Sequence, residues 1–324
     1  GLLGSDMAQV WVRSLLARQA ALRSVLDDIL GLASGQLASD AEMRESMGVV
    51  QHASVQLRAL VDELVALVLQ LVAPDTSSAG EPLAVRALLR QVSRELGNTA
   101  PRSVRVRCVE GTALDASIDV DRGFLMCVLG ALGRTALEVT AAGDVTCGVS
   151  VRDSALTLWL MADGFVAVPA AFGSATALSQ FVFGAGSRHE HTRRAGRLRL
   201  GIVQKLLSRR RSALEVSELD GLGLERRQVL SFRVPVAAAG LGPAHLGPTR
   251  ADVVSASAYL AAAGHDLRTP LNAILGFSAL LALSPQPRAA FAEHLHARAR
   301  ELRALVDATI AWAQRALDDD DVDG

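Results

Sequence analysis

The hexapeptide Leu57-Arg-Ala-Leu-Val-Asp62 occurs twice in this sequence, and its second copy is Leu302-Arg-Ala-Leu-Val-Asp307. The two copies are 245 residues apart (302 − 57). At the same offset, Leu22-Arg-Ser-Val-Leu-Asp-Asp-Ile-Leu-Gly31 falls on Leu267-Arg-Thr-Pro-Leu-Asn-Ala-Ile-Leu-Gly276, and six of these ten positions are identical. Helical composition can produce one such match by chance, but two matches at one offset without a gap indicate an internal repeat.

Each copy of the repeat has the pattern of a helical hairpin. In the first copy, we expect helices over residues 8–33 and 41–72. In the second copy, Ser284-Pro-Gln-Pro287 separates two helices, because proline ends one helix and starts the next. The apolar residues of these two helices recur at coiled-coil spacing: Leu260, Leu267, Leu271, Ile274 and Leu281, then Phe291, Leu295, Leu302, Leu305 and Trp312. One hairpin cannot cover such a seam alone, so two hairpins are expected to form a four-helix bundle.

The region between the copies mixes helical and strand patterns. Helices are predicted over residues 83–96, 124–139 and 200–207, and strands over 104–109, 145–151, 155–161, 213–216 and 229–236. The fold class is therefore α+β, with helical hairpins plus an α/β sandwich whose helices cover one face of a mixed sheet. The predicted domains are a first hairpin at 8–75, the α/β domain at 80–237, a linker at 238–251, a second hairpin at 252–317 and a structureless acidic tail at 318–324.

Composition excludes several classes of protein. The chain has 324 residues, of which 50% are hydrophobic and 4% aromatic, and its net charge of -1 gives no field that would attract nucleic acid or a membrane surface. The apolar run from Leu64 to Val72 is too short to cross a bilayer, and no secretory signal is evident. Cys108, Cys127 and Cys147 lack metal-ligand spacing and are expected to be small buried hydrophobes. These features predict a cytoplasmic location.

The segment Gly264-His-Asp-Leu-Arg-Thr-Pro-Leu-Asn-Ala-Ile274 carries the chemistry. Imidazole has a pKa near neutrality, so its neutral form supplies a nitrogen nucleophile. Because His265 lies off the leucine stripe, we expect it to face solvent. Pro270 crowds the carbonyl of Asp266, so a kink is expected beside the site. Residues 265–272 resemble the phosphotransfer motif of the sensor histidine kinases of bacterial two-component signalling.

The resemblance implies a role for three residues. His265 would accept a phosphoryl group, and Asp266 would orient or deprotonate its ring. Thr269, one helical turn further on, would assist the attack of water on a phosphorylated response regulator. In the first copy, Ala20, Ala21 and Val25 stand where His265, Asp266 and Pro270 stand in the second, so the first hairpin keeps the seam without the chemistry.

Residues 80–237 resemble the ATP-binding domain of the same family, and the resemblance implies a nucleotide site in three parts. Gly130 and Arg134 stand where the family has magnesium-binding asparagines. Asp163 matches the carboxylate that binds adenine, although Phe165 and Ala167 replace the glycines that follow it.

In the third part, Arg197 and Arg199 replace glycines whose backbone would approach the phosphates. Together these substitutions predict a degenerate ATP-binding domain that does not hydrolyse magnesium-ATP. The basic stretch from Arg188 to Arg199 is expected to be a solvated, mobile loop, with binding of phosphate or an acidic partner as the alternative. His189 and His191 lack a third ligand, so no metal is expected.

The resulting hypothesis is a histidine phosphotransfer protein that exchanges phosphate with a response regulator receiver domain and needs no cofactor. An upstream histidine kinase is a further possible partner. One alternative is an active kinase that autophosphorylates His265 from ATP and magnesium, and another is a non-catalytic pseudokinase scaffold. The two hairpins can pair within one chain or support a homodimer.

Overall fold

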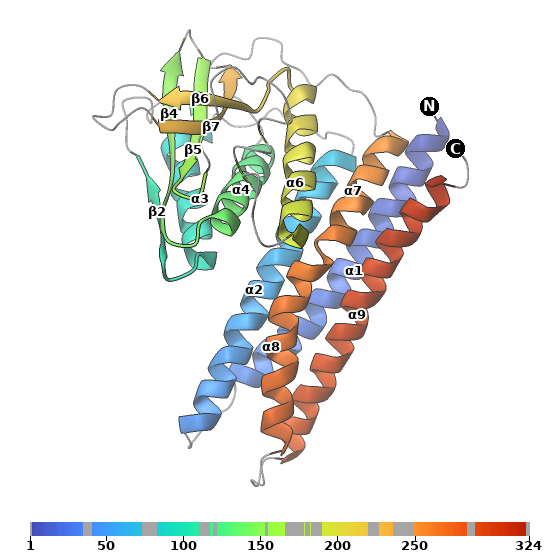
Figure 1. The fold of residues 1–324 in the computed structure, drawn as a ribbon. Coiled ribbons are helices and arrows are strands. Elements are labelled where there is room, and N and C mark those ends of the chain that lie inside the picture. The colour runs from blue at the N-terminus through green and yellow to red at the C-terminus, as the bar shows by residue number, and fades with distance from the viewer. Residues whose placement is uncertain are drawn as a thin grey trace. The chain divides into compact units, whose positions relative to one another are not determined.

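The structure is a computed structural model that describes residues 2–34, 41–72, 83–109, 117–118, 122–152, 155–165, 178, 182, 190–219, 227–235, 249–283 and 289–321. The chain divides into two compact units, Gly1–Ala73 with Pro248–Gly324, and Pro74–Gly247. The first unit is helical and the second combines helices with a sheet (Figure 1). The predicted α+β fold class, with helical hairpins and an α/β domain, is confirmed.

The helical unit is built from α1 (Leu2–Ser34), α2 (Ala41–Val72), α7 (Arg250–Ala262), α8 (Gly264–Leu283) and α9 (Ala289–Asp321). The helix α1 packs against α2 and α9, and α8 packs against the same two helices. The first helices of the two hairpins therefore lie diagonally across a bundle in which α7 and α8 together form one of the four rods (Figure 1). In this structure the two unlike hairpins pair within one chain.

The bundle core follows the predicted stripe on α8 but not on α9. All five apolar residues predicted for the α7–α8 rod are buried, with Leu271 and Ile274 at 1% and 0% exposure. On α9 only Leu295 and Leu302 of the predicted stripe are buried, and the remaining buried positions are Ala292, Ala299, Val306, Ile310 and Ala313. Phe291, Leu305 and Trp312 are half-buried at the margin of this line, because small and β-branched residues, which let helices approach closely, take its centre.

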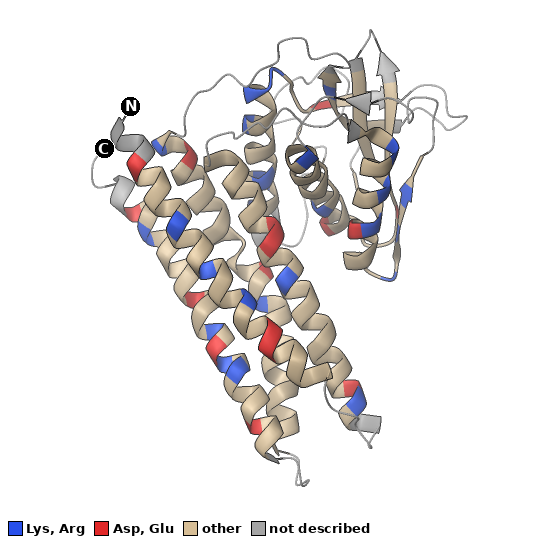
Figure 2. Cartoon of the chain, turned by 180° about the vertical axis from the view of Figure 1, so that it is seen from behind, with Lys and Arg blue, Asp and Glu red and all other residues tan. Residues whose placement is uncertain are grey.

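The ends of the bundle helices also differ from the prediction. The first helix begins at Leu2 rather than at residue 8. The helix α9 continues to Asp321, through most of the acidic segment that was expected to be structureless. Adding a residue to a long existing helix gains one hydrogen bond without a new nucleation step, which accounts for this extension. Charged residues of both signs are interspersed along the bundle helices (Figure 2).

The second unit contains α3 (Val85–Thr99), α4 (Arg122–Val139) and α6 (Glu190–Arg209), with strands β1 (Leu83–Ala84), β2 (Val104–Cys108), β3 (Ser117–Ile118), β4 (Gly143–Arg152), β5 (Ala155–Ala162), β6 (Glu215–Leu219) and β7 (Arg227–Pro235). Among the described residues, five strands form one sheet in the order β2-β4-β5-β7-β6. The pair β2–β4 is parallel and the other pairs are antiparallel. Because α3 and α4 contact this sheet and α6 contacts α4, the three helices form one layer.

The parallel pair of strands places Cys108 directly beside Cys147. Two causes raise the pKa of the Cys147 thiol far above its usual range: mainly a hydrogen bond with Cys108, and secondly the burial of the thiol. The thiolate is the reactive form, so Cys147 should stay protonated and unreactive in the folded protein. Cys108 and Cys127 are only half-buried, which corrects the expectation that all three cysteines are buried.

We predict that N-ethylmaleimide at pH 8 leaves Cys147 unmodified in the native protein and modifies it after denaturation. Mass spectrometry of the peptides measures the difference. Modification of native Cys147 at the rate of the unfolded chain would contradict this account of the sheet.

Candidate functional site

The helix that carries the site begins with a well-formed cap and is interrupted once. The Oγ1 of Thr249 accepts a hydrogen bond from the amide of Asp252, whose carboxylate accepts one from the amide of Thr249. This capping box satisfies amides that lack partners within the helix. The interruption falls at Ala263, between α7 and α8, whereas Pro270, from which a kink beside the site was predicted, lies inside α8.

His265 is the second residue of α8, and its side chain is exposed. The buried residues of this helix include Leu267, Leu271 and Ile274. With 3.6 residues per turn, these positions direct His265 away from the bundle core. The placement agrees with the expectation from the sequence and leaves the imidazole open to a partner molecule.

The two predicted auxiliary residues lie next to this histidine on α8. Asp266 follows it directly and is half-buried, whereas Thr269 is exposed one turn further on. The Oγ1 of Thr269 donates a hydrogen bond to the backbone carbonyl of His265 at 3.4 Å. The helix therefore brings His265, Asp266 and Thr269 together, and their catalytic roles remain predictions.

Two contacts that sequence reasoning missed hold α9 close to the site. An added Cβ at Gly264 would lie 2.7 Å from the Cδ1 of Ile310, so glycine here permits a close approach of α9. One turn along α8, Arg268 donates to the carboxylate of Asp307 at 3.0 Å. The signal for this pair was present in the repeat, because both Arg268 and Asp307 have identical residues in the first copy.

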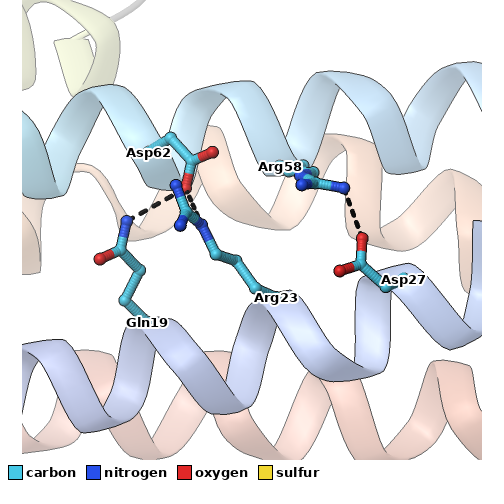
Figure 3. A network of polar contacts seen from close by, with 5 residues as sticks. All are labelled: Gln19, Arg23, Asp27, Arg58 and Asp62. Atoms are coloured by element: carbon cyan, nitrogen blue, oxygen red, sulfur yellow. Dashed lines mark hydrogen bonds and ion pairs between the residues drawn. The ribbon is translucent and has the colours of Figure 1, made fainter.

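In the first hairpin, a polar network occupies the corresponding place (Figure 3). The carboxylate of Asp62 accepts hydrogen bonds from Arg23 at 2.6 Å and from Gln19 at 3.1 Å. Arg58 forms an ion pair with Asp27 beside it. All these side chains project from α1 and α2, so the network fastens the two helices of this hairpin together.

Comparison of the hairpins shows what the first one lacks. Gln19 corresponds to Gly264, and Asp27 corresponds to Asn272. Ala20, which corresponds to His265, is exposed on α1. The first hairpin therefore presents a methyl group where the second presents an imidazole.

The predicted adenine carboxylate, Asp163, has a contact within the sheet. Its Oδ2 accepts a hydrogen bond from the amide of Asp144 at 2.8 Å, where β4 begins. Gly143 adopts a φ of 116°, and a Cβ there would lie 2.3 Å from the same Oδ2. Asp163 thus connects the end of β5 to the start of β4, and its relation to a nucleotide remains a prediction.

The stretch that contains Arg197 and Arg199 was expected to be a solvated loop, and this expectation was wrong. Residues Glu190–Arg209 form α6. Arg199 is fully buried and donates to both carboxylate oxygens of Glu138 on α4, at 2.8 and 2.9 Å. It also donates to the Oγ1 of Thr135 at 3.1 Å. Because a paired guanidinium can be buried, α6 continues through residues that looked too polar to pack.

Burial of Arg199 also leaves fewer arginines for the alternative prediction, in which this basic stretch binds phosphate or an acidic partner. Arg194 and Arg197 are exposed on α6, and Arg188 lies outside the described residues, as does His189. Arg210, just after α6, stacks over Phe124 with 4.2 Å between its Cζ and the ring centroid. Within the described part of the chain, no group of His, Cys, Asp and Glu side chains has an arrangement suited to a metal ion.

The comparisons with known proteins bear on the second hairpin. The model of the His Kinase A (phospho-acceptor) domain matches residues 255–315, a segment that contains His265, Asp266 and Thr269. No curated protein matches the chain.

Similar solved structures are histidine kinases. Full-length ShkA in complex with AMPPNP is 20% identical, with a TM-score of 0.42, over 69% of this chain and 45% of ShkA. The blue-light activated histidine kinase EL346 of Erythrobacter litoralis is 13% identical, with a TM-score of 0.35, over 63% and 66% of the two chains. AdeS of Acinetobacter baumannii is 16% identical, with a TM-score of 0.35, over 66% and 95%. This chain thus spans less than half the length of ShkA.

No helix in the described residues combines the length and the apolar character needed to cross a membrane. The site itself consists of an exposed histidine, His265, on a helical hairpin that lies within the segment matched by the phospho-acceptor model. The match to the His Kinase A (phospho-acceptor) domain covers the second hairpin, so residues 255–315 are similar to the phospho-acceptor segment of histidine kinases.

Proposed function

We propose that this chain is a histidine phosphotransfer protein in which His265 takes a phosphoryl group from one receiver domain and passes it to another. The observation that carries the proposal is the contrast between the two sites. His265 is exposed within a matched phospho-acceptor segment, whereas Arg199 is buried against Glu138 where the family has a glycine beside the nucleotide phosphates.

The residues of the α/β domain do not fit a magnesium nucleotide by the family's contacts. Gly130 has no side chain to bind magnesium, and Arg134 would repel the cation. A glycine at position 199 would let the backbone approach phosphate, but the long side chain of Arg199 instead joins α6 to α4. These features support a source of phosphate other than ATP bound by this domain.

The proposed transfer needs no cofactor in this chain. The lone pair of the unprotonated ring nitrogen of His265 attacks the phosphorus of a receiver aspartyl phosphate. A P–N bond forms, the P–O bond breaks, and the aspartate leaves as a carboxylate. The product is a phosphoimidazolium, and its remaining ring N–H proton passes to Asp266 or to water. The reverse sequence delivers the phosphoryl group to the next receiver.

The test uses the full chain and a receiver domain phosphorylated with a labelled acyl phosphate. The proposal expects acid-labile label to appear on His265 and to leave when an unphosphorylated second receiver is added. A parallel incubation with γ-labelled ATP and magnesium should give no label. The absence of label with every receiver tried, or robust labelling from ATP, would reject the relay in favour of the scaffold or the autokinase respectively.

Thr269→Ala separates transfer from hydrolysis. We expect this variant to accept phosphate on His265 at the wild-type rate, because the hydroxyl is not the nucleophile. We also expect slower loss of phosphate from a receiver mixed with the chain, because the hydroxyl would help to position water. The rate of inorganic phosphate release measures the effect, and Thr269→Ser should restore it.

A further inference from the structure

Contacts inside each hairpin repeat along with the sequence. Arg23 pairs with Asp62 at 2.6 Å, and Arg268 pairs with Asp307 at 3.0 Å. The two pairs are related by the sequence offset, since 268 − 23 and 307 − 62 both equal 245. The counterpart of any residue in the first hairpin is therefore found by adding 245 to its number.

The aromatic contacts between the hairpins do not repeat. Trp11 on α1 lies against Trp312 on α9, with 5.2 Å between the ring centroids. The Nε1 of Trp11 donates to the Oγ of Ser257 at 3.1 Å. The counterparts of the two tryptophans are Ala256 and Leu67, and both are buried. The seam between α1 and α9 thus holds two large rings. The equivalent seam, between α2 and the α7–α8 rod, holds two aliphatic side chains.

A cation on α1 adds to this asymmetry. The guanidinium of Arg18 lies over the ring of Trp312, 5.0 Å from its centroid. The counterpart of Arg18 is Ala263, which is buried at the α7–α8 junction. Arginine over an indole face is an attractive arrangement that an alanine cannot reproduce.

An ion pair on the same seam is also present only once. Arg298 on α9 approaches Asp28 on α1, with 3.3 Å between Nη2 and Oδ2. Their counterparts are Ala53 and Ala273. Opposite charges therefore meet on the α1–α9 seam, while the corresponding position of the other seam is occupied by two alanines.

From these contacts we propose that Trp11, Arg18, Asp28, Arg298 and Trp312 select the pairing of unlike hairpins within one chain and exclude the pairing of like hairpins. These five residues are called the pairing determinants below. The inference goes beyond the proposed phosphotransfer and does not depend on it. The surface that it assigns is the α1–α9 seam, and the partner of each hairpin is the other hairpin of the same chain.

Pairing of two second hairpins with this geometry would lose each contact. Trp312 would face Ala256 of the other copy, and Arg298 would face Ala273. The seam would contain an underfilled space beside the indole, and Arg298 would keep Glu301 of its own helix but lose the carboxylate of Asp28 across the seam. Because a symmetric pair has two equivalent seams, both defects would occur twice.

Pairing of two first hairpins fails in the complementary way. Trp11 would face Leu67, and Asp28 would face Ala53 without a cation. Random divergence of two copies would not place tryptophan against tryptophan and arginine against aspartate on the same seam. Complementary residues on unlike copies are the pattern expected of a surface that distinguishes partners.

Cross-linking tests which hairpins meet. In the full chain with its native cysteines replaced by serine, Asp28→Cys/Arg298→Cys places two thiols on the observed seam. Ala273→Cys/Arg298→Cys places them where two second hairpins would meet. With a short bis-maleimide, we expect the first variant to form an intrachain cross-link that exceeds interchain product by at least about tenfold. The second variant should form no interchain dimer. Interchain product that equals the intrachain product in the first variant, or an interchain dimer of the second, would overturn the proposal.

A second measurement removes the three pairing determinants on α1. Light scattering should report a monomeric mass for the wild-type chain. The triple variant Trp11→Ala/Arg18→Ala/Asp28→Ala should associate at high protein concentration. Without these side chains, the first hairpin no longer favours the second hairpin of its own chain over the hairpins of another chain. Arg58→Ala, which breaks an ion pair inside the first hairpin, is the matched control and should remain monomeric. A dimeric mass for the wild-type chain would overturn the proposal.

Discussion

His265→Ala is expected to reduce labelling of the chain from a phosphorylated receiver to background. Alanine has no nucleophile, and no second imidazole lies at the corresponding place in the first hairpin, where the residue is Ala20. The substitution should change the free energy of unfolding by no more than about 0.5 kcal/mol, because His265 is exposed and lies away from the core. Label transfer and thermal unfolding, measured on the same preparation, separate loss of the acceptor from loss of the fold.

The control for this prediction is His52→Ala. His52 is also exposed on a bundle helix, α2, but lies outside the matched phospho-acceptor segment. Its replacement should leave labelling and stability unchanged. If His265→Ala retained half or more of the wild-type label, another residue would have to be the acceptor.

The first hairpin provides a gain-of-function comparison. Ala20→His in a His265→Ala background restores an imidazole but not the acidic neighbour, since Ala21 occupies that position. We expect little label from this variant and more when Ala21→Asp is added. Equal labelling of both would show that the acidic neighbour contributes nothing to transfer.

Glu138→Ala is expected to have the largest effect on stability. It removes the carboxylate that accepts two hydrogen bonds from the fully buried guanidinium of Arg199. An uncompensated buried charge costs about 3–5 kcal/mol, so opening of α4 and α6 should become correspondingly easier. Hydrogen exchange of the amides in these two helices measures the change without interference from the bundle.

Two variants give this prediction its controls. Glu138→Leu/Arg199→Met removes both charges and should recover most of the lost stability, because a well-packed apolar pair replaces a buried ion pair at little cost. Arg105→Ala removes a more exposed partner from the pair with Asp144 in the same domain and should cost less than about 1 kcal/mol. A similar small cost for Glu138→Ala would mean that water reaches Arg199 readily.

The parts of the fold that depend on long periodic segments could be predicted from the sequence. The repeat located both hairpins, and the leucine spacing on the α7–α8 rod identified its buried face. The same method failed on α9 because it weighted leucine and aromatic residues over alanine. In a bundle, Ala299 and Ala313 occupy the centre because close helix packing favours small side chains there.

The site was predicted in part for a different reason. A motif on one helix fixes the order and spacing of His265, Asp266 and Thr269, so their proximity follows from helical geometry. The pair of Arg199 and Glu138 could not be found in this way, because it joins residues 61 positions apart (199 − 138) on different helices. A run of arginines suggests a solvated loop until the buried carboxylate that one of them meets is known.

Placing both hairpins in one chain has a consequence for how the bundle can change. In a symmetric homodimer, every substitution appears at two places, so a residue that improves one seam must be tolerated in the other. Here a substitution appears once. Asp28 could become the neighbour of Arg298 while its counterpart Ala273 remained uncharged. Likewise, alanine could occupy position 20 of the first hairpin while its counterpart His265 remained available in α8. Each half of the bundle is free to specialise at the level of single residues.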